Sequence, residues 1–444
     1  MRHPLPTRVL AAFTLLLVIL VAIIAADFAF FRGRTPPINC PGSIASLEKV
    51  QLGGLDQWIL IRGWDTTAPV VLFLHGGPGM PAMYLAHDFQ RQLERSFVVV
   101  HWDRRGAGKS YSSGLQGDLT VRQTLNDTYQ LTRILRSRFG GKRIYLVGHS
   151  WGTYLGMLAA WEHPEYYAAY VGLGQESAGR QRVAEAQKEF LAHEAGVSGD
   201  SALLTYLKSS SSKVREDDLF RYGAELHNAT NFLPLLLVGV CAPEYTFSDA
   251  MNVKKGADLV GRQMIYDVIS EPLDHAVPKI DIPVFFFLGR HDYTTPSSLA
   301  AQYLDSLNCP LKKLVWFENS AHFPFFEEPE RFRLEMLNVD STSRSFWVRE
   351  DNSEFHPPQE RRGQPPSSDS VDRRDARVHC DPARCKCQSA VRRHSSAATA
   401  DHAPGIWPVS LSQLACANLF LPTSSSVASS RKRRASRPGR YWYG

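Results

Sequence analysis

The sequence has few cysteines, and they do not form a framework. Seven cysteines occur in 444 residues, and only Cys40, Cys241 and Cys309 lie between the N-terminal apolar run and the C-terminal tail. Three scattered thiols do not make a disulfide scaffold. The tail cysteines at positions 380, 385 and 387 have C-x4-C-x-C spacing, which is a poor match to structural zinc sites. The sequence therefore argues against a fold built on disulfides or zinc.

Residues 1–340 lack an excess of positive charge. The chain has a net charge of +6, but residues 341–444 carry 17 Lys and Arg against 9 Asp and Glu, which leaves −2 for residues 1–340. A body with this balance has no electrostatic signature of nucleic-acid binding, so we expect no nucleic-acid partner. The tail 341–444 is rich in Ser, Pro and Arg without sustained periodicity, so we predict that it is disordered.

The sequence also lacks a complete phosphate-binding loop. The segment "GAGKS", residues 106–110, resembles the end of such a loop. The pattern needs a glycine five residues before Gly108, and Asp103 stands there. Nucleotide binding is therefore disfavoured.

One long apolar run is present near the N-terminus. Val9 to Ala26 are 18 residues without a charge, a length that can span the core of a bilayer. A cleaved signal peptide is the alternative, but three phenylalanines shortly after the run prolong it and favour an uncleaved anchor. Arg2, Arg8 and the terminal amine slightly outweigh Arg32 and Arg34 beside Asp27, which places the body outside the cytoplasm by the positive-inside rule. We predict a membrane anchor with its flanks at residues 1–35.

Short apolar runs that alternate with helical patterns indicate a mostly parallel sheet covered on both faces. The runs are "WILIRG" from Trp58, "PVVLFLHGG" from Pro69, "FVVVHWD" from Phe97, "RIYLVG" from Arg143, "YVGLG" from Tyr170, "IPVFFFLG" from Ile282 and "KLVWFE" from Lys313. Between about residues 175 and 279 charged helical stretches replace the strands, which is long for one connection. We therefore predict an α/β core at 36–175 and 280–340, interrupted by a helical cap at 176–279.

A serine between two glycines follows one of these runs. Gly148-His-Ser-Trp-Gly152 lies between "RIYLVG" and a stretch with apolar residues at helical spacing. A sharp turn from strand to helix strains the backbone at its corner, and small residues two positions away on each side prevent clashes; this is the G-x-S-x-G nucleophile elbow. We predict that Ser150 is a catalytic nucleophile.

A serine hydroxyl needs a base to accept its proton, and the base needs a third group to orient it. Asp292 and His322 follow two late predicted strands, at the sheet edge that carries Ser150, whereas Asp281 precedes its strand and belongs to the opposite edge. His291 is a rival base, but it adjoins Asp292 on the same loop. The order serine, acid, histidine is the one expected of α/β-hydrolases. We predict a catalytic triad of Ser150, Asp292 and His322.

A glycine-rich segment completes the predicted site. "LFLHGGPG" ends a strand at His75 and continues into glycines that let the backbone approach a bound carbonyl. Acyl transfer needs hydrogen-bond donors for the developing oxyanion. We assign this role to the backbone N–H groups of Gly77 and Trp151.

Taken together, these motifs resemble the proline iminopeptidase branch of the α/β-hydrolase superfamily over residues 47–339. The segments that carry the resemblance are His75–Gly79, "WDRRGAGKS" (Trp102–Ser110), Gly148–Gly152 and the late Asp292 and His322. The resemblance implies an α/β-hydrolase fold with a sheet of about eight strands, a helical cap and serine catalysis without a metal or organic cofactor. It also implies release of an N-terminal residue, often proline, from small amides or short peptides.

Two positions depart from the family pattern. Arg104 stands where glutamine is common, and His149 stands where glycine is frequent. The resemblance also implies acidic cap residues that hold the free amine of the substrate. Glu176, Glu225 and Glu244 are candidates by location.

Two alternative functions remain open at this point. An esterase or lactonase would use the same triad on a substrate without a free amine. A catalytically inactive, membrane-tethered binding protein would keep the fold alone, because fold does not fix function. An epoxide hydrolase is disfavoured because its reaction requires a carboxylate as the nucleophile at the elbow. The sequence carries no signal for the oligomeric state.

Overall fold

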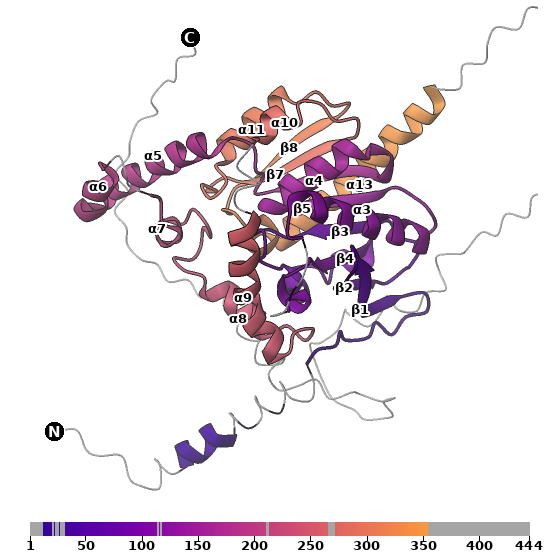
Figure 1. The fold of residues 1–444 in the computed structure, drawn as a ribbon, viewed down its shortest axis with the longest axis horizontal. Coiled ribbons are helices and arrows are strands. Elements are labelled where there is room, and N and C mark those ends of the chain that lie inside the picture. The colour runs from indigo at the N-terminus through magenta and orange to yellow at the C-terminus, as the bar shows by residue number, and fades with distance from the viewer. Residues whose placement is uncertain are drawn as a thin grey trace, which may run out of the picture.

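The centre of the molecule is an eight-stranded sheet with the order β1-β2-β4-β3-β5-β6-β7-β8 (Figure 1). This computed structural model describes residues 12–19, 22, 26, 32–112, 115, 118–209, 213–264 and 271–353. β1 pairs antiparallel with β2, and β2 with β4, while the other neighbours are parallel. The strands are β1 Ile44–Leu52, β2 Leu55–Gly63, β3 Val70–Leu74, β4 Val98–Asp103, β5 Ile144–His149, β6 Tyr167–Leu173, β7 Val284–Gly289 and β8 Lys312–Phe317.

Helices cover both faces of the sheet, and the strand sequences explain why. Strands β3 to β7 are buried along their whole length, as expected of strands covered on both sides. Successive side chains point to opposite faces: Leu72 and Leu74 join the core with α3, α4 and α11, whereas Val71 and Phe73 join the core with α13. The core helices are α2 Ala86–Phe89, α3 Val121–Arg138, α4 Trp151–Glu162, α11 Ser297–Ser306, α12 Pro324–Glu327 and α13 Pro329–Ser353.

One strand is missing from the sequence-based prediction. Trp58 lies in the second strand, because β1 precedes it and turns into β2 at Gly53 and Gly54. β1 is an edge strand whose side chains are mostly half-exposed. Its pattern of apolar and polar residues is therefore weaker than that of the buried strands, and this explains the omission.

The described residues between β6 and β7 form helices, at the position predicted for the cap. In Figure 1 these helices lie to the left of the sheet, except the last one, which lies above it. They are α5 Arg180–Ser198, α6 Ser201–Leu207, α7 Glu216–Arg221, α8 Leu233–Val240, α9 Phe247–Met264 and α10 Leu273–Ala276. α9 packs tightly on the core, because a Cβ atom on its Gly256 would lie 3.2 Å from Cα of Ala107 and would clash with the carbonyl oxygen of Gly106.

The predicted boundary of the tail needs a correction. α13 continues to Ser353, so residues 341–353 are helical rather than disordered. Trp347 explains the extension, since its indole N–H donates to the carbonyl oxygen of Ala168 at 2.9 Å and so fixes the helix to β6. The remainder of the predicted tail, 354–444, lies outside the described residues.

The predicted membrane anchor falls largely outside the described residues. Of the run Val9 to Ala26, the structure describes positions 12–19, 22 and 26. Among the helices of the described part of the chain, none has the length and apolar character needed to cross a membrane. The anchor and the location of the body outside the cytoplasm stay predictions.

Candidate active site

Ser150 occupies the sharp turn between β5 and α4. Its backbone has φ 52° and ψ −128°, and no other non-glycine residue in the described chain has a positive φ. Such a conformation costs about 1–3 kcal/mol and persists only where the surrounding structure fixes it. Here the Ser150 N–H donates to the carbonyl oxygen of Leu173 at 3.0 Å, and the Ser150 carbonyl accepts from the N–H of Thr153 at 2.8 Å. The backbone at Ser150 has the strained turn that the G-x-S-x-G pattern predicts.

The glycines around Ser150 are required by close backbone approaches. A Cβ atom on Gly148 would lie 2.7 Å from the carbonyl oxygen of Gly152, and one on Gly152 would clash with the carbonyl oxygen of Leu74. A Cβ atom on Gly76 would lie 2.8 Å from Cβ of Ser150. The loop after β3 therefore lies directly against the elbow.

Asp292 and His322 form a buried pair at the same edge of the sheet. Asp292 follows β7, His322 follows β8, and both are almost fully buried. Asp292 Oδ2 lies 2.9 Å from His322 Nδ1. Thr295 fixes the carboxylate, because its backbone N–H and its hydroxyl donate to the two Asp292 oxygens at 2.9 Å each. This pairing favours the proton on Nδ1 and leaves Nε2 available as a base.

The end of β6 connects the elbow to His322. Leu173 accepts the hydrogen bond of the Ser150 N–H, and a Cβ atom on the next residue, Gly174, would lie 2.7 Å from His322 Nδ1. His149 holds the base from a second side, with its Nε2 at 2.9 Å from the carbonyl oxygen of His322. Burial, together with the charge of His322, keeps the pKa of His149 well below its usual range, so the neutral ring donates from Nε2. The three predicted triad residues therefore come from one edge of the sheet, around the end of β6.

The two residues predicted to supply oxyanion donors are Trp151, which follows Ser150, and Gly77, in the loop after β3. Trp151 is the first residue of α4, where a backbone N–H has no acceptor within the helix. Gly77 has a φ of 108°, and a Cβ atom there would clash with the backbone nitrogen of Met80. Only glycine fits that position without strain. Because the preceding residue, Gly76, contacts Ser150, the loop brings the Gly77 peptide to the elbow.

Two of the three candidate cap carboxylates lie near the base. The charges of Glu176 and Glu225 both act on His322, and burial raises the pKa of each carboxyl above its ordinary value. Within the described residues neither carboxylate forms an ion pair, and Glu225 accepts a hydrogen bond from the hydroxyl of Thr294. Glu244 lies apart from these two residues, and its carboxylate accepts a hydrogen bond from the hydroxyl of Thr35 at 2.9 Å.

The carboxylates change the acidity of the base. Burial alone would lower the pKa of His322, but the negative charges of Asp292, Glu225 and Glu176, with the hydrogen bond to Asp292, outweigh it and raise the pKa to about 9. A positive charge near Glu176 and Glu225 would offset these negative charges. It would then favour the neutral ring that accepts a proton from serine.

His291, the rival base, points to a different part of the molecule. Its ring stacks on the ring of His227, with the centroids 3.7 Å apart. Both rings line a cavity of about 850 Å³ in the cap, whose lining also includes Phe190, Arg221, Tyr222 and Leu237. None of the three predicted triad residues lines this cavity.

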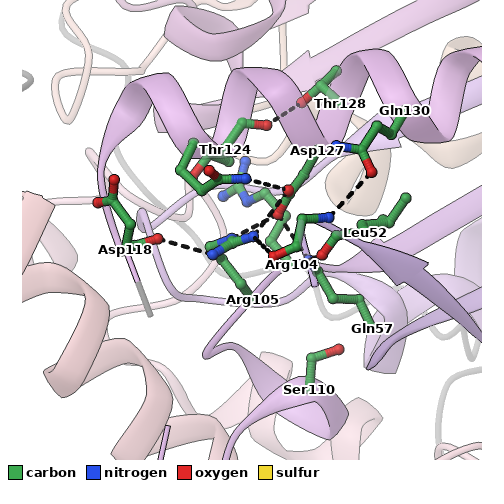
Figure 2. Close-up of polar contacts among 12 residues, drawn as sticks. Leu52, Gln57, Arg104, Arg105, Ser110, Asp118, Thr124, Asp127, Thr128 and Gln130 are labelled. Carbon is green, nitrogen blue, oxygen red and sulfur yellow. Dashed lines mark hydrogen bonds and ion pairs between the residues drawn. The ribbon is translucent and has the colours of Figure 1, made fainter. Parts of the chain in front are cut away.

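A buried ion pair fixes the loop that follows β4. Figure 2 shows Arg105 against Asp127 of α3, with Arg105 Nε at 2.6 Å from Oδ2 and Nη2 at 2.9 Å from Oδ1. Gln57 and Gln123 also donate to the Asp127 carboxylate, at 2.7 and 2.9 Å. Because every carboxylate oxygen has partners, the loop backbone at Arg104 and Arg105 is held firmly beside the site.

Sequence reasoning missed several residues that support the predicted site. Thr295 orients Asp292, His149 holds the backbone of His322, and Arg104 contacts the loop after β3. Thr295 had a usable signal, because it lies three residues after an acid in "DYTTP" and a threonine there can close a turn. Arg104 and His149 were noticed as departures, but their contacts depend on packing between distant strands.

Comparisons with known proteins agree with this architecture. The model of the alpha/beta hydrolase family matches residues 71–333. The chain is similar to the "Probable aminopeptidase YbaC" of Bacillus subtilis, with 30% identity over 302 residues that cover 65% of this chain and 94% of that protein. It is also similar to a proline iminopeptidase of Saccharolobus solfataricus, with 24% identity over 58% of this chain and 80% of that protein. The solved proline iminopeptidase of Mycobacterium smegmatis shares the fold, with a TM-score of 0.51 and 18% identity over 68% of this chain and 99% of that one. This chain therefore belongs to the alpha/beta hydrolase family, as an enzyme similar to its proline iminopeptidase branch.

Proposed function

We propose that this enzyme is a serine hydrolase that releases the N-terminal residue, of proline type, from short peptides or amides. The observation that carries the proposal is a pair of carboxylates beside His322, the half-buried Glu176 and the buried Glu225, neither of which has an ion-pair partner in the described residues. Buried charges are normally paired, so a site of this kind fits the ammonium group of a substrate. The similarity to a protein named as an aminopeptidase and to proline iminopeptidases supports the same activity.

The reaction begins with proton transfer from Ser150. His322 Nε2 accepts the hydroxyl proton while Oγ attacks the carbonyl carbon of the scissile bond, and Asp292 stabilises the imidazolium that forms. The negative charge moves to the carbonyl oxygen, where the N–H groups of Gly77 and Trp151 donate to it. His322 then gives its proton to the leaving nitrogen, which breaks the C–N bond and leaves an acyl-enzyme.

Water completes the cycle through the same groups. His322 removes a proton from the water, whose oxygen attacks the acyl carbon, and the second tetrahedral intermediate collapses to release the free carboxylic acid and Ser150. No other co-reactant is needed to balance the reaction.

The substrate amine has a specific role in this proposal. An ammonium group at Glu176 and Glu225 fixes the first residue of the substrate so that its carbonyl lies at Ser150. Blocking the amine removes the positive charge and leaves both carboxylates unpaired. The enzyme should therefore distinguish a free N-terminus from a blocked one, whereas an esterase or lactonase with the same triad should not.

The test compares three substrates with the full-length protein: a proline arylamide with a free amine, its N-blocked form and a short-chain ester. We expect the free amine to be preferred and turnover to be lost in Ser150→Ala. Glu225→Gln tests the amine-binding site. Glu244→Gln is its matched control, because Glu244 is also a buried carboxylate but is bound to Thr35. Equal rates for the free and the blocked amide would contradict the aminopeptidase proposal, and failure of Ser150 to react with a fluorophosphonate would favour an inactive binding protein.

A further inference from the structure

The side chain of Arg104 is buried against the loop that carries the predicted oxyanion donor. Arg104 is 2% exposed. Its Nη2 lies within hydrogen-bonding distance of three carbonyl oxygens of this loop, at 2.7 Å from His75, 3.1 Å from Gly76 and 2.7 Å from Pro78. The three acceptors surround Gly77, the residue whose N–H faces the elbow in the proposed mechanism. A peptide whose neighbouring carbonyls are held in this way has little freedom to rotate its N–H away from the site.

The same guanidinium also contacts the second predicted donor residue. Its central carbon lies 4.6 Å from the ring centre of Trp151, in a cation–π contact. Arg104 therefore links the loop after β3 to the first residue of α4. Both residues that supply oxyanion donors in the proposed mechanism are thus held by one side chain.

The charge of Arg104 is unusual for a buried group. Within the described part of the chain, no carboxylate forms an ion pair with it, and its Nη1 has no hydrogen-bond partner. Burial lowers the pKa of Arg104 to about 9, partly offset by the charge of Asp103, so the side chain is still positively charged at neutral pH. A buried cation without a carboxylate partner is costly unless negative charge appears nearby, and the tetrahedral intermediate supplies such charge.

The position of Arg104 is fixed by its surroundings. Its backbone N–H lies 3.3 Å from Nε2 of His75. The next residue, Arg105, is locked to Asp127 in the network of Figure 2. The two arginines of "WDRRG" therefore differ in their partners. The charge of Arg105 is neutralised by Asp127, whereas the charged side chain of Arg104 contacts the carbonyl oxygens of the loop after β3.

We propose that Arg104 is a positioning residue of the oxyanion hole, which fixes the Gly77 peptide through the neighbouring carbonyls and adds a positive charge behind the developing oxyanion. The inference rests on the proposed serine mechanism, but it does not depend on whether the substrate is an amide or an ester. It also gives a reason for arginine at this position. A glutamine could donate to the loop but would supply no charge.

The test uses Arg104→Lys, Arg104→Gln and Arg104→Ala in the full-length protein. A positioning residue for the transition state should change kcat much more than KM. We expect Arg104→Ala to lower kcat by about 10²-fold, the lower end of the range for loss of one oxyanion donor, with KM changed less than threefold. Arg104→Lys should recover part of the loss because it keeps the charge, and Arg104→Gln should lie closer to Arg104→Ala.

The control is Arg62→Gln. Arg62 is also a largely buried arginine, but it pairs with Glu94 at 2.8 Å. The kcat of the Arg62→Gln variant should therefore stay close to the wild-type value. Thermal unfolding of each variant identifies those that fail to fold. If Arg104→Ala does not fold, Arg104→Lys and Arg104→Gln still test the proposal.

Two results would overturn the inference. One is a loss that appears in KM alone, and the other is equal kcat values for Arg104→Lys, Arg104→Gln and the wild type. The kinetics are measured on a short-chain ester as well as on the amide. If the ester is cleaved and the amide is not, the aminopeptidase proposal fails while the role of Arg104 is still tested.

Discussion

The backbone N–H of His322 donates a hydrogen bond to the carbonyl oxygen of Glu225 at 3.0 Å. The proposed base and one of the proposed amine-binding residues are therefore joined directly, although they are far apart in the sequence. Glu327 strengthens this junction, because its carboxylate accepts from the N–H groups of Ala321 and His227 at 2.7 Å each. The cap and the loop of the base should consequently move together.

Glu225→Gln should change the pH dependence of catalysis. The negative charge of Glu225 is one of the causes that raise the pKa of His322 to about 9, so its removal lowers that pKa. His322 acts as a base only when neutral, and the rise of kcat/KM with increasing pH should therefore move to lower pH in the variant. The profile is measured on the short-chain ester, which has no amine to interact with Glu225. An unchanged or upward-shifted profile would argue against the charge coupling.

The same variant should lose its preference for a free amine. Truncating one partner of a buried charge pair typically costs about 2–5 kcal/mol. We therefore expect kcat/KM for the free-amine arylamide to fall by at least about 30-fold in Glu225→Gln. The N-blocked form should change far less, and Glu244→Gln should behave like the wild type. Parallel losses on both substrates would indicate a damaged site rather than lost amine recognition.

Ser150 should be a site of stored backbone strain. Its φ of 52° lies in a region that glycine adopts freely and alanine does not. Both Ser150→Ala and Ser150→Gly should be inactive, but the glycine variant should be more stable than the alanine variant, by about 1 kcal/mol. Denaturant unfolding of the two inactive variants measures the difference. A less stable glycine variant would show that the turn at Ser150 is not strained in solution.

The Arg105–Asp127 pair should contribute to stability. Asp127→Ala leaves a buried guanidinium without its partner, and we expect a loss of about 3–5 kcal/mol in the free energy of unfolding. Arg122→Ala removes an exposed pair with Glu162 and should cost at most about 1 kcal/mol. The comparison is made by denaturant unfolding. Similar small losses in both variants would mean that the buried network does not hold the loop.

Much of the fold was predictable because buried parallel strands leave a clear apolar pattern. The strands before Ser150 and Asp292 are continuous apolar runs, and the strand before His322 begins with two lysines but ends in an apolar run. The residues at the ends of these strands follow from the common direction of the strands. β1 was missed because an edge strand has mixed exposure, and α13 was cut short because its last turns are polar on most sides. In both elements the local pattern of apolar residues is a poor guide to the secondary structure.

The supporting residues were harder to predict for a different reason. Arg104 and Glu225 lie far in sequence from the groups they contact, and only the order of strands and the docking of the cap bring them there. By their location in the sequence, Glu176, Glu225 and Glu244 were equal candidates for binding the amine. In the structure, Glu244 lies apart from the other two. Which acid faces the base is thus a property of cap packing, and short motifs do not encode it.

The most direct test of amine recognition by this enzyme is the ratio of kcat/KM for a proline arylamide with a free amine to that for its N-blocked form, measured with the full-length protein. We expect a ratio well above one that falls toward one in Glu225→Gln, and no turnover of either substrate by Ser150→Ala. A ratio near one in the wild-type enzyme, with the ester cleaved readily, would contradict amine recognition and identify an esterase that uses the same serine.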